Sequence, residues 1–143
     1  MPDIHKVKII SPAETYPLRR AVLRKNMPNE SHEFNGDFDG NTFHLGYFND
    51  NQLLGIVTIM KNGEVAQIRG MAVDEHQQGK GIGRELMIMA EKMLTQENVH
   101  KIWMNARETA VPFYEKLGYA IEGEIFMIKP IGFHYLMTKY YDK

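Results

Sequence analysis

The sequence predicts an α/β fold, a mixed sheet with crossover helices in the order β-α-β-β-β-α-β-α-β-β. Short β-rich runs alternate along the chain with three stretches of helical character. Three of the β-rich runs follow one another across short turns, as in an antiparallel meander. The length of 143 residues fits one core, so we expect a single domain over residues 1–143.

The first elements are predicted from an alternating run and a helix start signal. HKVKII predicts a strand over residues 5–10. Ser11 is a suitable N-cap and Pro12 a suitable first helical residue, which predicts a helix over residues 12–25. Residues 26–40 contain prolines, asparagines and glycines without periodicity, and we expect a loop there.

Three strands and a long helix follow. TFHLGYF, QLLGIVTIM and VAQIRGMAV are β-rich, with turn residues at 49–51 and 61–64 between them. Beyond Val73 the apolar spacing becomes helical as far as residue 96. The predicted buried face of this helix consists of Ile82, Leu86, Met89 or Ala90, and Met93.

The C-terminal third alternates strands with one more helix. KIWMN predicts a strand, and residues 107–117 predict a helix with Pro112 near its first turn. Gly118 is expected to end this helix as a left-handed cap. Two further strands are predicted over residues 119–127 and 133–139.

Composition and charge exclude several functional classes. The net charge is −1 and no long basic run is present, so we expect neither nucleic acid nor an anionic membrane as partner. No apolar run approaches the roughly 20 residues that cross a bilayer, and the N-terminus resembles no targeting signal, which favours the cytoplasm. The chain has no cysteine, and its six histidines are scattered singly, so we expect no metal site. A homodimer is possible.

The stretch DEHQQGKGIGRELM holds glycines at positions 79, 81 and 83, directly before the long helix. A helix N-terminus presents unpaired N–H groups, and glycines allow an anion to approach them closely. The spacing lacks the GxxxxGK[ST] of a P-loop, and Leu86 stands where GxGxxG requires glycine. The loop therefore predicts an anion site of a different kind, or a plain tight turn.

Two motifs together resemble the GNAT superfamily of acetyl-CoA-dependent N-acetyltransferases. The first is Q-x-x-G-x-G, formed by Gln78, Gly81 and Gly83 after the strand that ends in MAV. The second is WMNARETAVPFYEKLGY, with an asparagine at the end of a strand and a tyrosine on the next helix. The resemblance is strong over residues 55–119. LRRAVLR, FHLGYF, IRGMAV, NAR and IGFHYLM extend it over nearly the whole chain, to an uncharacterised subgroup of small bacterial-type members with the GNAT-like fold.

The resemblance implies that acetyl-CoA is the cosubstrate. It implies that backbone groups of Met71 and Val73 hold the pantetheine arm, and that a free N–H near Met71 or Ala72 meets the acetyl carbonyl. Asn105 would bond a pantetheine amide; alternatively it caps the following helix. The residues that the resemblance places around the pyrophosphate are Gln78, Gly79, Lys80, Gly81, Gly83 and Arg84, of which Lys80 and Arg84 are alternatively solvated helix residues.

Tyr114 is the candidate general acid. Phe113 and Leu117 form an i, i+4 core pair, so Tyr114 points roughly 100° away from them. By resemblance, its hydroxyl bonds the CoA sulfur and protonates the departing thiolate. The alternative is a half-buried tyrosine of the core.

The general base is less directly indicated. Many members of the family carry a glutamate on the fourth strand, but the matching positions here are Gln67 and Arg69, which cannot accept a proton near neutral pH. His134 and His44 lie on predicted strands, and imidazole suits base catalysis. His134 is favoured because the last two strands border the acceptor cleft in this fold; a structural histidine or a water chain is the alternative.

The acceptor is expected to be a primary amine of a small molecule, acetylated directly in a ternary complex. Arginines near the site would suit a carboxylate or phosphate, whereas acidic residues in the loop over residues 30–39 would suit a polyamine or a lysine. Alternatives are a protein lysine or N-terminal amine, or a non-catalytic CoA-binding sensor. The predicted acceptor-binding residues are Arg19, Arg24, His44, Arg69 and His134.

Overall fold

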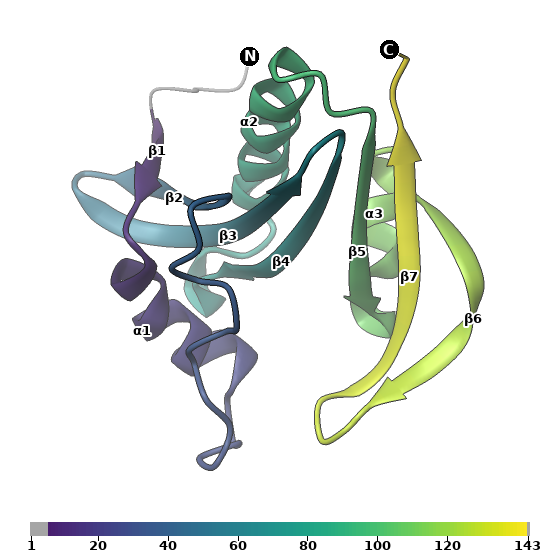
Figure 1. Cartoon of the computed structure of the whole chain (residues 1–143). Coiled ribbons are helices and arrows are strands. Elements are labelled where there is room, and N and C mark those ends of the chain that lie inside the picture. Colours follow the sequence, from purple (N-terminus) through teal and green to yellow (C-terminus); the bar gives the residue numbers. More distant parts are fainter. Residues whose placement is uncertain (1–5, 143) are drawn as a thin grey trace.

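Seven strands form one mixed sheet in the order β1-β2-β3-β4-β5-β7-β6 in the computed structural model, which describes residues 6–142 (Figure 1). The strands are β1 (Val7–Ile10), β2 (Thr42–Asn49), β3 (Gln52–Asn62), β4 (Val65–Val73), β5 (Lys101–Arg107), β6 (Ala120–Ile128) and β7 (Gly132–Tyr140). The helices are α1 (Tyr16–Leu18), α2 (Ile82–Gln96) and α3 (Val111–Lys116). This order confirms the predicted α/β mixed sheet; the predicted His5 at the start of the first strand lies outside the described residues.

The first helical segment begins as predicted and ends irregularly. Ser11 and Glu14 form a capping box, in which each side chain bonds the other residue's backbone N–H. A 3-10 turn (Pro12–Thr15) leads into α1, and a π-helical turn (Arg19–Leu23) ends the segment two residues earlier than expected. The N–H of Arg24 closes that turn by donating to the carbonyl of Arg19 at 2.9 Å. The chain then enters the predicted loop.

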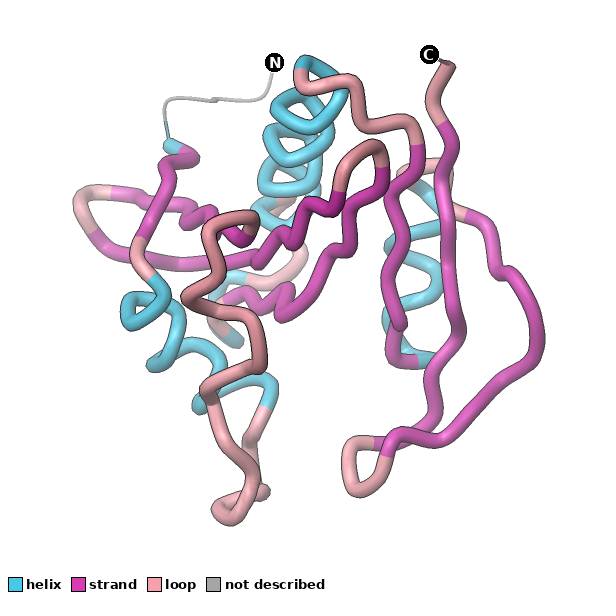
Figure 2. The backbone as a smooth tube through the Cα atoms, viewed as in Figure 1, coloured by secondary structure: helices cyan, strands magenta, loops and turns pink. Residues whose placement is uncertain are grey.

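Helix α2 covers one face of the sheet, and α1 with the loop after it lies on the opposite face (Figures 1 and 2). The predicted apolar stripe of α2 is largely confirmed, because Ile82 and Leu86 are buried. Of the two predicted alternatives Met89 and Ala90, Ala90 is the buried one. At the end of the stripe Leu94 is buried, where Met93 was predicted. These side chains join those of the central strands in the main apolar core.

The sheet opens between β4 and β5, the two strands that diverge at its centre (Figure 1). They are parallel and pair only from Val65 to Gln67 on β4. On its other edge β4 pairs with β3, but Gly70 and Met71 together oppose a single residue of β3, which is a β-bulge. Gly70 has a φ of 60°, which an L-residue rarely adopts. The half of β4 beyond Gln67 therefore has one edge unpaired by β5.

Two C-terminal boundaries differ from the prediction. Strand β5 continues beyond Asn105 to Arg107, and the helix starts later, with a 3-10 turn (Glu108–Ala110) before α3. Pro112 lies in the first turn of α3, and Gly118 has the predicted positive φ, 95°. Over residues 6–142, the helices are all too short or too polar to span a bilayer.

Candidate active site

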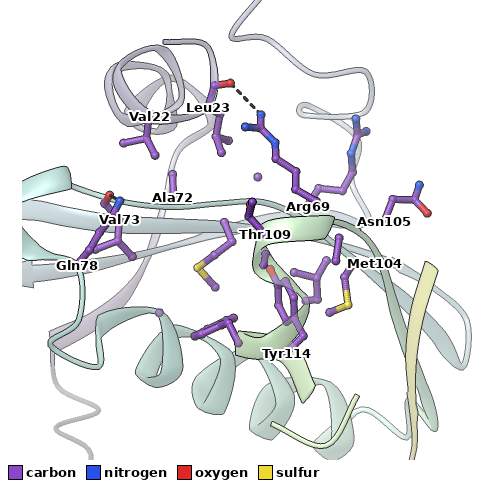
Figure 3. A pocket seen from close by; sticks show the side chains of 18 of the residues that line it. Val22, Leu23, Arg69, Ala72, Val73, Gln78, Met104, Asn105, Thr109 and Tyr114 are labelled. Carbon is purple, nitrogen blue, oxygen red and sulfur yellow. Dashed lines mark hydrogen bonds between the residues drawn. The ribbon is translucent and has the colours of Figure 1, made fainter. Parts of the chain in front are cut away.

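A cleft of about 870 Å³ occupies the opening between β4 and β5 (Figure 3). Its walls come from β4, the glycine loop, the start of α2, the end of β5, α3, β7 and the chain around Leu23. The cleft therefore brings together segments that are far apart in the sequence. Of the predicted site residues, those that line it are Arg24, Arg69, Met71, Ala72, Val73, Gln78, Gly79, Gly81, Gly83, Arg84, Asn105, Tyr114 and His134.

The glycine loop forms one end of the cleft. Gly79 and Gly81 have φ values of 81° and 84°, and Gly81 is the left-handed N-cap of α2. Apart from the glycine and its two chain neighbours, no heavy atom of residues 6–142 lies within 4 Å of the place where a Cβ would stand at either residue. The positive φ values favour glycine at both positions, and the open space beside them leaves room for an anion to approach the N-terminus of α2.

The residues around the glycines hold this loop against its neighbours. The Gln78 side-chain amide donates to the carbonyl of Val73 at 3.1 Å, which ties the loop to the end of β4. A methyl group at Gly83 would lie 3.1 Å from Cζ of Phe113, so glycine allows α2 and α3 to approach closely here. Arg84 is exposed at the rim. Lys80 is exposed and is not among the lining residues; its ammonium donates to Oε1 of Gln77 at 3.2 Å.

Strand β4 supplies the floor of the cleft. Met71, Ala72 and Val73 all line it, at and beyond the bulge. Because β5 has diverged, backbone groups on this edge are not paired by a neighbouring strand. An extended ligand with amide groups can hydrogen-bond to such an edge in the way that an added strand does.

Asn105 and Tyr114 face β4 across the cleft. Asn105 lies inside β5, and the helical turns after it are capped by Arg107 and Ala110, so the N-cap interpretation of Asn105 is wrong. Its exposed side chain has no hydrogen-bond partner among residues 6–142. The amide is therefore available to a ligand.

Tyr114 is 6% exposed and turns its hydroxyl into the cleft (Figure 3). Its ring packs edge-on against Phe113 and Tyr119, with centroid distances of 4.9 and 5.9 Å. Burial raises the pKa of the Tyr114 hydroxyl above its ordinary value of 10.0. The group consequently stays protonated over the whole neutral range and can act only as a donor of its proton.

His134 lines the cleft from β7 and is 5% exposed. Its Nδ1 lies 2.8 Å from the carbonyl oxygen of Gly132. A carbonyl can only accept, so Nδ1 carries the hydrogen and Nε2 of the neutral ring has a free lone pair. The ring of Phe126 lies beside the imidazole, with 6.0 Å between the ring centroids and 29° between the ring planes.

Three arginines, Arg24, Arg69 and Arg107, line the cleft on the side of α1 and the following loop. Phe34 from that loop lines the cleft beside them, and the guanidinium groups of Arg24 and Arg69 each lie 5.1 Å from its ring centroid. Burial lowers the pKa of all three arginines below the ordinary value. The positions predicted to replace a family glutamate, Gln67 and Arg69, also line the cleft.

Arg19 and His44 lie outside the cleft lining, which corrects their predicted role in acceptor binding. Arg19 is fully buried and forms two hydrogen bonds with the Asp37 carboxylate, at 2.7 and 2.9 Å. It also donates to the hydroxyl of Thr58 at 2.8 Å, and Nδ1 of His44 lies 2.8 Å from the same oxygen. Nε2 of His44 donates to the carbonyl of Asp37 at 3.1 Å, so both ring nitrogens are occupied within the protein.

Arg107 and Phe34 are cleft residues that were not predicted. Arg107 was placed at the start of a helix, yet the alternation of KIWMNAR continues to that residue, with Ile102, Met104 and Ala106 buried. That alternation is a signal from which the longer strand could have been predicted, with Arg107 on the same strand face as Asn105. Phe34 lies in a loop without periodicity, where no local pattern indicates its position.

Comparisons with known proteins agree with this geometry. The family model of the acetyltransferase (GNAT) domain matches residues 7–137. The uncharacterized N-acetyltransferase YitI of Bacillus subtilis (strain 168) is 33% identical over 141 residues, which cover 94% of this chain and 95% of YitI.

Solved structures share the fold. ElaA of Escherichia coli superposes with a TM-score of 0.80 at 20% identity, over 93% of this chain and 98% of that protein. PaiA N-acetyltransferase from Thermoplasma acidophilum, solved with coenzyme A, gives a TM-score of 0.73 at 18% identity, over 94% of this chain and 99% of that protein. The family match covers most of the chain, and YitI is similar over nearly its whole length. The chain therefore belongs to the GNAT family and is an acetyltransferase.

Proposed function

We propose that this protein transfers the acetyl group of acetyl-CoA directly to a primary amine of a small molecule, within a ternary complex. One observation carries the proposal: a single cleft connects the glycine loop, the unpaired edge of β4, Tyr114 and His134. An anion site, a backbone docking edge, a proton donor and a proton acceptor are the groups that acetyl transfer from a thioester requires.

The cleft residues fit the cosubstrate. Gly79 and Gly81 leave the N-terminus of α2 open to a pyrophosphate, and Arg84 adds a positive charge at the rim. The free edge of β4 at Met71 and Val73 suits the amides of the pantetheine arm, with Asn105 facing them. The complex of PaiA with coenzyme A supports this assignment.

Acetyl-CoA supplies an activated acyl group, and the protein supplies the proton transfers. A free backbone N–H at the bulge, near Met71 or Ala72, stabilises negative charge on the acetyl oxygen. The amine nitrogen forms the new bond to the carbonyl carbon as the carbon–sulfur bond breaks. Tyr114 then gives its proton to the departing thiolate.

His134 accepts the proton that the amine loses. Nε2 has the free lone pair because Nδ1 donates to the carbonyl of Gly132, and that hydrogen bond orients the ring. Gln67 and Arg69 line the same cleft but cannot serve as bases near neutral pH. The histidine thus takes the role that an acidic residue would otherwise fill.

The test is release of free CoA from acetyl-CoA across a panel of amines. With an accepted amine, Tyr114→Phe is expected to lower kcat roughly 100-fold or more, whereas Tyr16→Phe, at a residue outside the cleft, leaves kcat unchanged.

Initial-velocity lines that intersect when both substrates are varied support a ternary complex, and parallel lines contradict it. Activity of the wild type should show no loss from tyrosine ionisation below pH 10, because burial raises the pKa of Tyr114.

Each contrary result has a distinct meaning. Tight binding of acetyl-CoA without CoA release for any amine would make the protein a sensor of the cosubstrate. Turnover of peptides with free lysine or N-terminal amines, but of no small amine, would point to a protein acceptor. Failure to bind acetyl-CoA would overturn the proposal as a whole.

A further inference from the structure

The charge of the cleft lining is of one sign. Its ionisable side chains other than His134 and Tyr114 are Arg24, Arg69, Arg84, Arg107 and Lys116. No aspartate or glutamate of residues 6–142 lines the cleft. The acids of the loop over residues 30–39, which the sequence offered as a site for a cationic substrate, do not face it.

Arg24, Arg69 and Arg107 are neighbours in the cleft. Arg24 and Arg69 each lie 5.1 Å from the ring centroid of Phe34, and Arg24 and Arg107 share the Leu23 carbonyl. Val73 adjoins the glycine loop. Arg69 lies four residues before Val73 on β4, so roughly 13 Å separates the two residues at the rise of an extended strand. The bulge at Gly70 and Met71, where the acetyl group is expected, lies between them. Arg107 stands opposite His134 in the β5–β7 register, so it is next to the proposed base and not next to the pyrophosphate.

The three arginines are held by neutral groups. Leu23 contributes one carbonyl that accepts from Arg107 at 2.9 Å and from Arg24 at 3.3 Å. Arg24 also donates to the carbonyl of Ser31 at 3.0 Å, and Arg69 donates to the carbonyl of Asn35 at 3.3 Å. None of the three forms an ion pair with a carboxylate of the described chain. Each guanidinium has five N–H donors, so several remain for a ligand.

This arrangement is electrostatically unfavourable without a ligand. Burial is the largest cause that lowers the pKa of Arg24 and the charge of Arg107 is the second; the charge of Glu30 offsets only part of this, so the pKa is lowered overall. Two partly desolvated cations are therefore positioned next to one another with only a carbonyl dipole between them. An anion placed among them would relieve the repulsion and gain charge-assisted hydrogen bonds.

From this cluster we infer that the amine acceptor carries an anionic group, a carboxylate or a phosphate monoester, which Arg24, Arg69 and Arg107 bind while the amine faces His134. The inference rests on the proposed acetyltransfer to an amine. Guanidinium groups suit both anions because their parallel N–H groups match two oxygens. The same cluster repels polyamines and other multiply cationic acceptors.

The experiment compares matched acceptors that differ only in the anionic group. β-Alanine is paired with β-alaninamide, and O-phosphoethanolamine with ethanolamine, and kcat/KM for CoA release is measured for each. The anionic member of at least one pair is expected to be preferred about 10- to 100-fold, and the pair that shows the preference identifies the anion. Arg69→Gln and Arg107→Gln should each abolish this preference by raising KM for the anionic acceptor. Lys25→Gln, at a residue outside the cleft, should retain the preference.

A second readout separates this inference from the proposed reaction. The same compounds are titrated by calorimetry into protein saturated with CoA, where no acetyl transfer occurs. Tighter binding of an anionic probe, lost in either arginine variant while its thermal unfolding midpoint stays well above the titration temperature, supports the anion site even if no amine is acetylated. Equal rates and equal affinities within both pairs, or no binding of either anionic probe, overturn it.

Discussion

Three arginines lie over the ring of Phe34, and they differ in whether a carboxylate matches their charge. Arg19 lies 3.8 Å from the ring centroid, fully buried and paired with Asp37 through two hydrogen bonds. Arg24 and Arg69 lie 5.1 Å from the same ring but have no carboxylate partner in the described chain. The difference teaches that residue type alone does not assign a role: an arginine whose charge is matched within the fold belongs to the structure, and an unmatched one is available to a ligand.

The strongest test of this comparison is to remove the carboxylate of the buried pair. Asp37→Asn leaves Arg19 charged and buried, so the free energy of unfolding is expected to fall by about 3–5 kcal/mol. Urea denaturation measures the change. Asp39→Asn, at an exposed position two residues further along the loop, is the control and should change the free energy of unfolding by about 0.5 kcal/mol or less. A loss below about 1 kcal/mol for Asp37→Asn would mean that the pair is not structural.

Acid should also lower the free energy of unfolding by weakening the Arg19–Asp37 pair, although by less than Asp37→Asn does. Burial tends to raise the pKa of Asp37, but hydrogen bonds from Arg19 and from the Phe34 N–H, with the Arg19 charge, lower it overall. A carboxylate whose pKa is depressed by folding stabilises the protein fully above about pH 5, and this contribution is lost as the pH falls below about 4. Unfolding measured from pH 7 to pH 3 should show a smaller loss in Asp37→Asn than in the wild type; equal slopes would contradict the assignment.

Phe34 links the two groups of arginines, so its replacement should affect both stability and catalysis. Phe34→Leu removes ring contacts with three guanidinium groups, and the free energy of unfolding is expected to fall by about 1–2 kcal/mol. The KM for the acceptor should rise as well, because Phe34 lines the cleft. Phe38→Leu is the matched control, since that ring is 75% exposed. An effect on stability alone would remove Phe34 from the acceptor site.

The smallest effect on stability is expected for a cleft arginine. Arg107→Gln loses one hydrogen bond to the Leu23 carbonyl and should lower the free energy of unfolding by about 1 kcal/mol. Arg19→Gln, measured in the same urea series, should lower the free energy of unfolding several times more than Arg107→Gln, because it leaves the Asp37 carboxylate without its partner. Similar losses for the two variants would break the distinction between a structural and a ligand-binding arginine.

The order of elements was predictable because each has a local signal. The Ser11 capping box starts the first helical segment, turn residues separate the meander strands, and the period changes from two to 3.6 at the glycine loop. The end of β5 was predicted two residues too early, at Asn105, although the alternation of buried and exposed residues continues to Arg107. Register and the opening between β4 and β5 depend on tertiary contacts that no local pattern contains.

The site was predictable where motifs are contiguous. The glycine loop and Tyr114 were located from short sequence patterns, and both line the cleft. Arg19 and His44 were misplaced because their partners are distant: Asp37 is 18 residues from Arg19, and Thr58 is 39. Whether a buried polar side chain meets a partner is decided by the fold, so their sequence positions alone could not distinguish structure from function.

The unpaired stretch of β4 also bears on how this protein avoids sticking to itself. An open strand edge on the outside of a sheet attracts strands of other chains and promotes aggregation. Here the open edge lies at the bottom of a cleft whose walls include Leu23 on one side and Tyr114 on the other. The unpaired edge is therefore enclosed by other segments of the same domain and does not form an outer edge of the sheet, where strands of other chains would reach it.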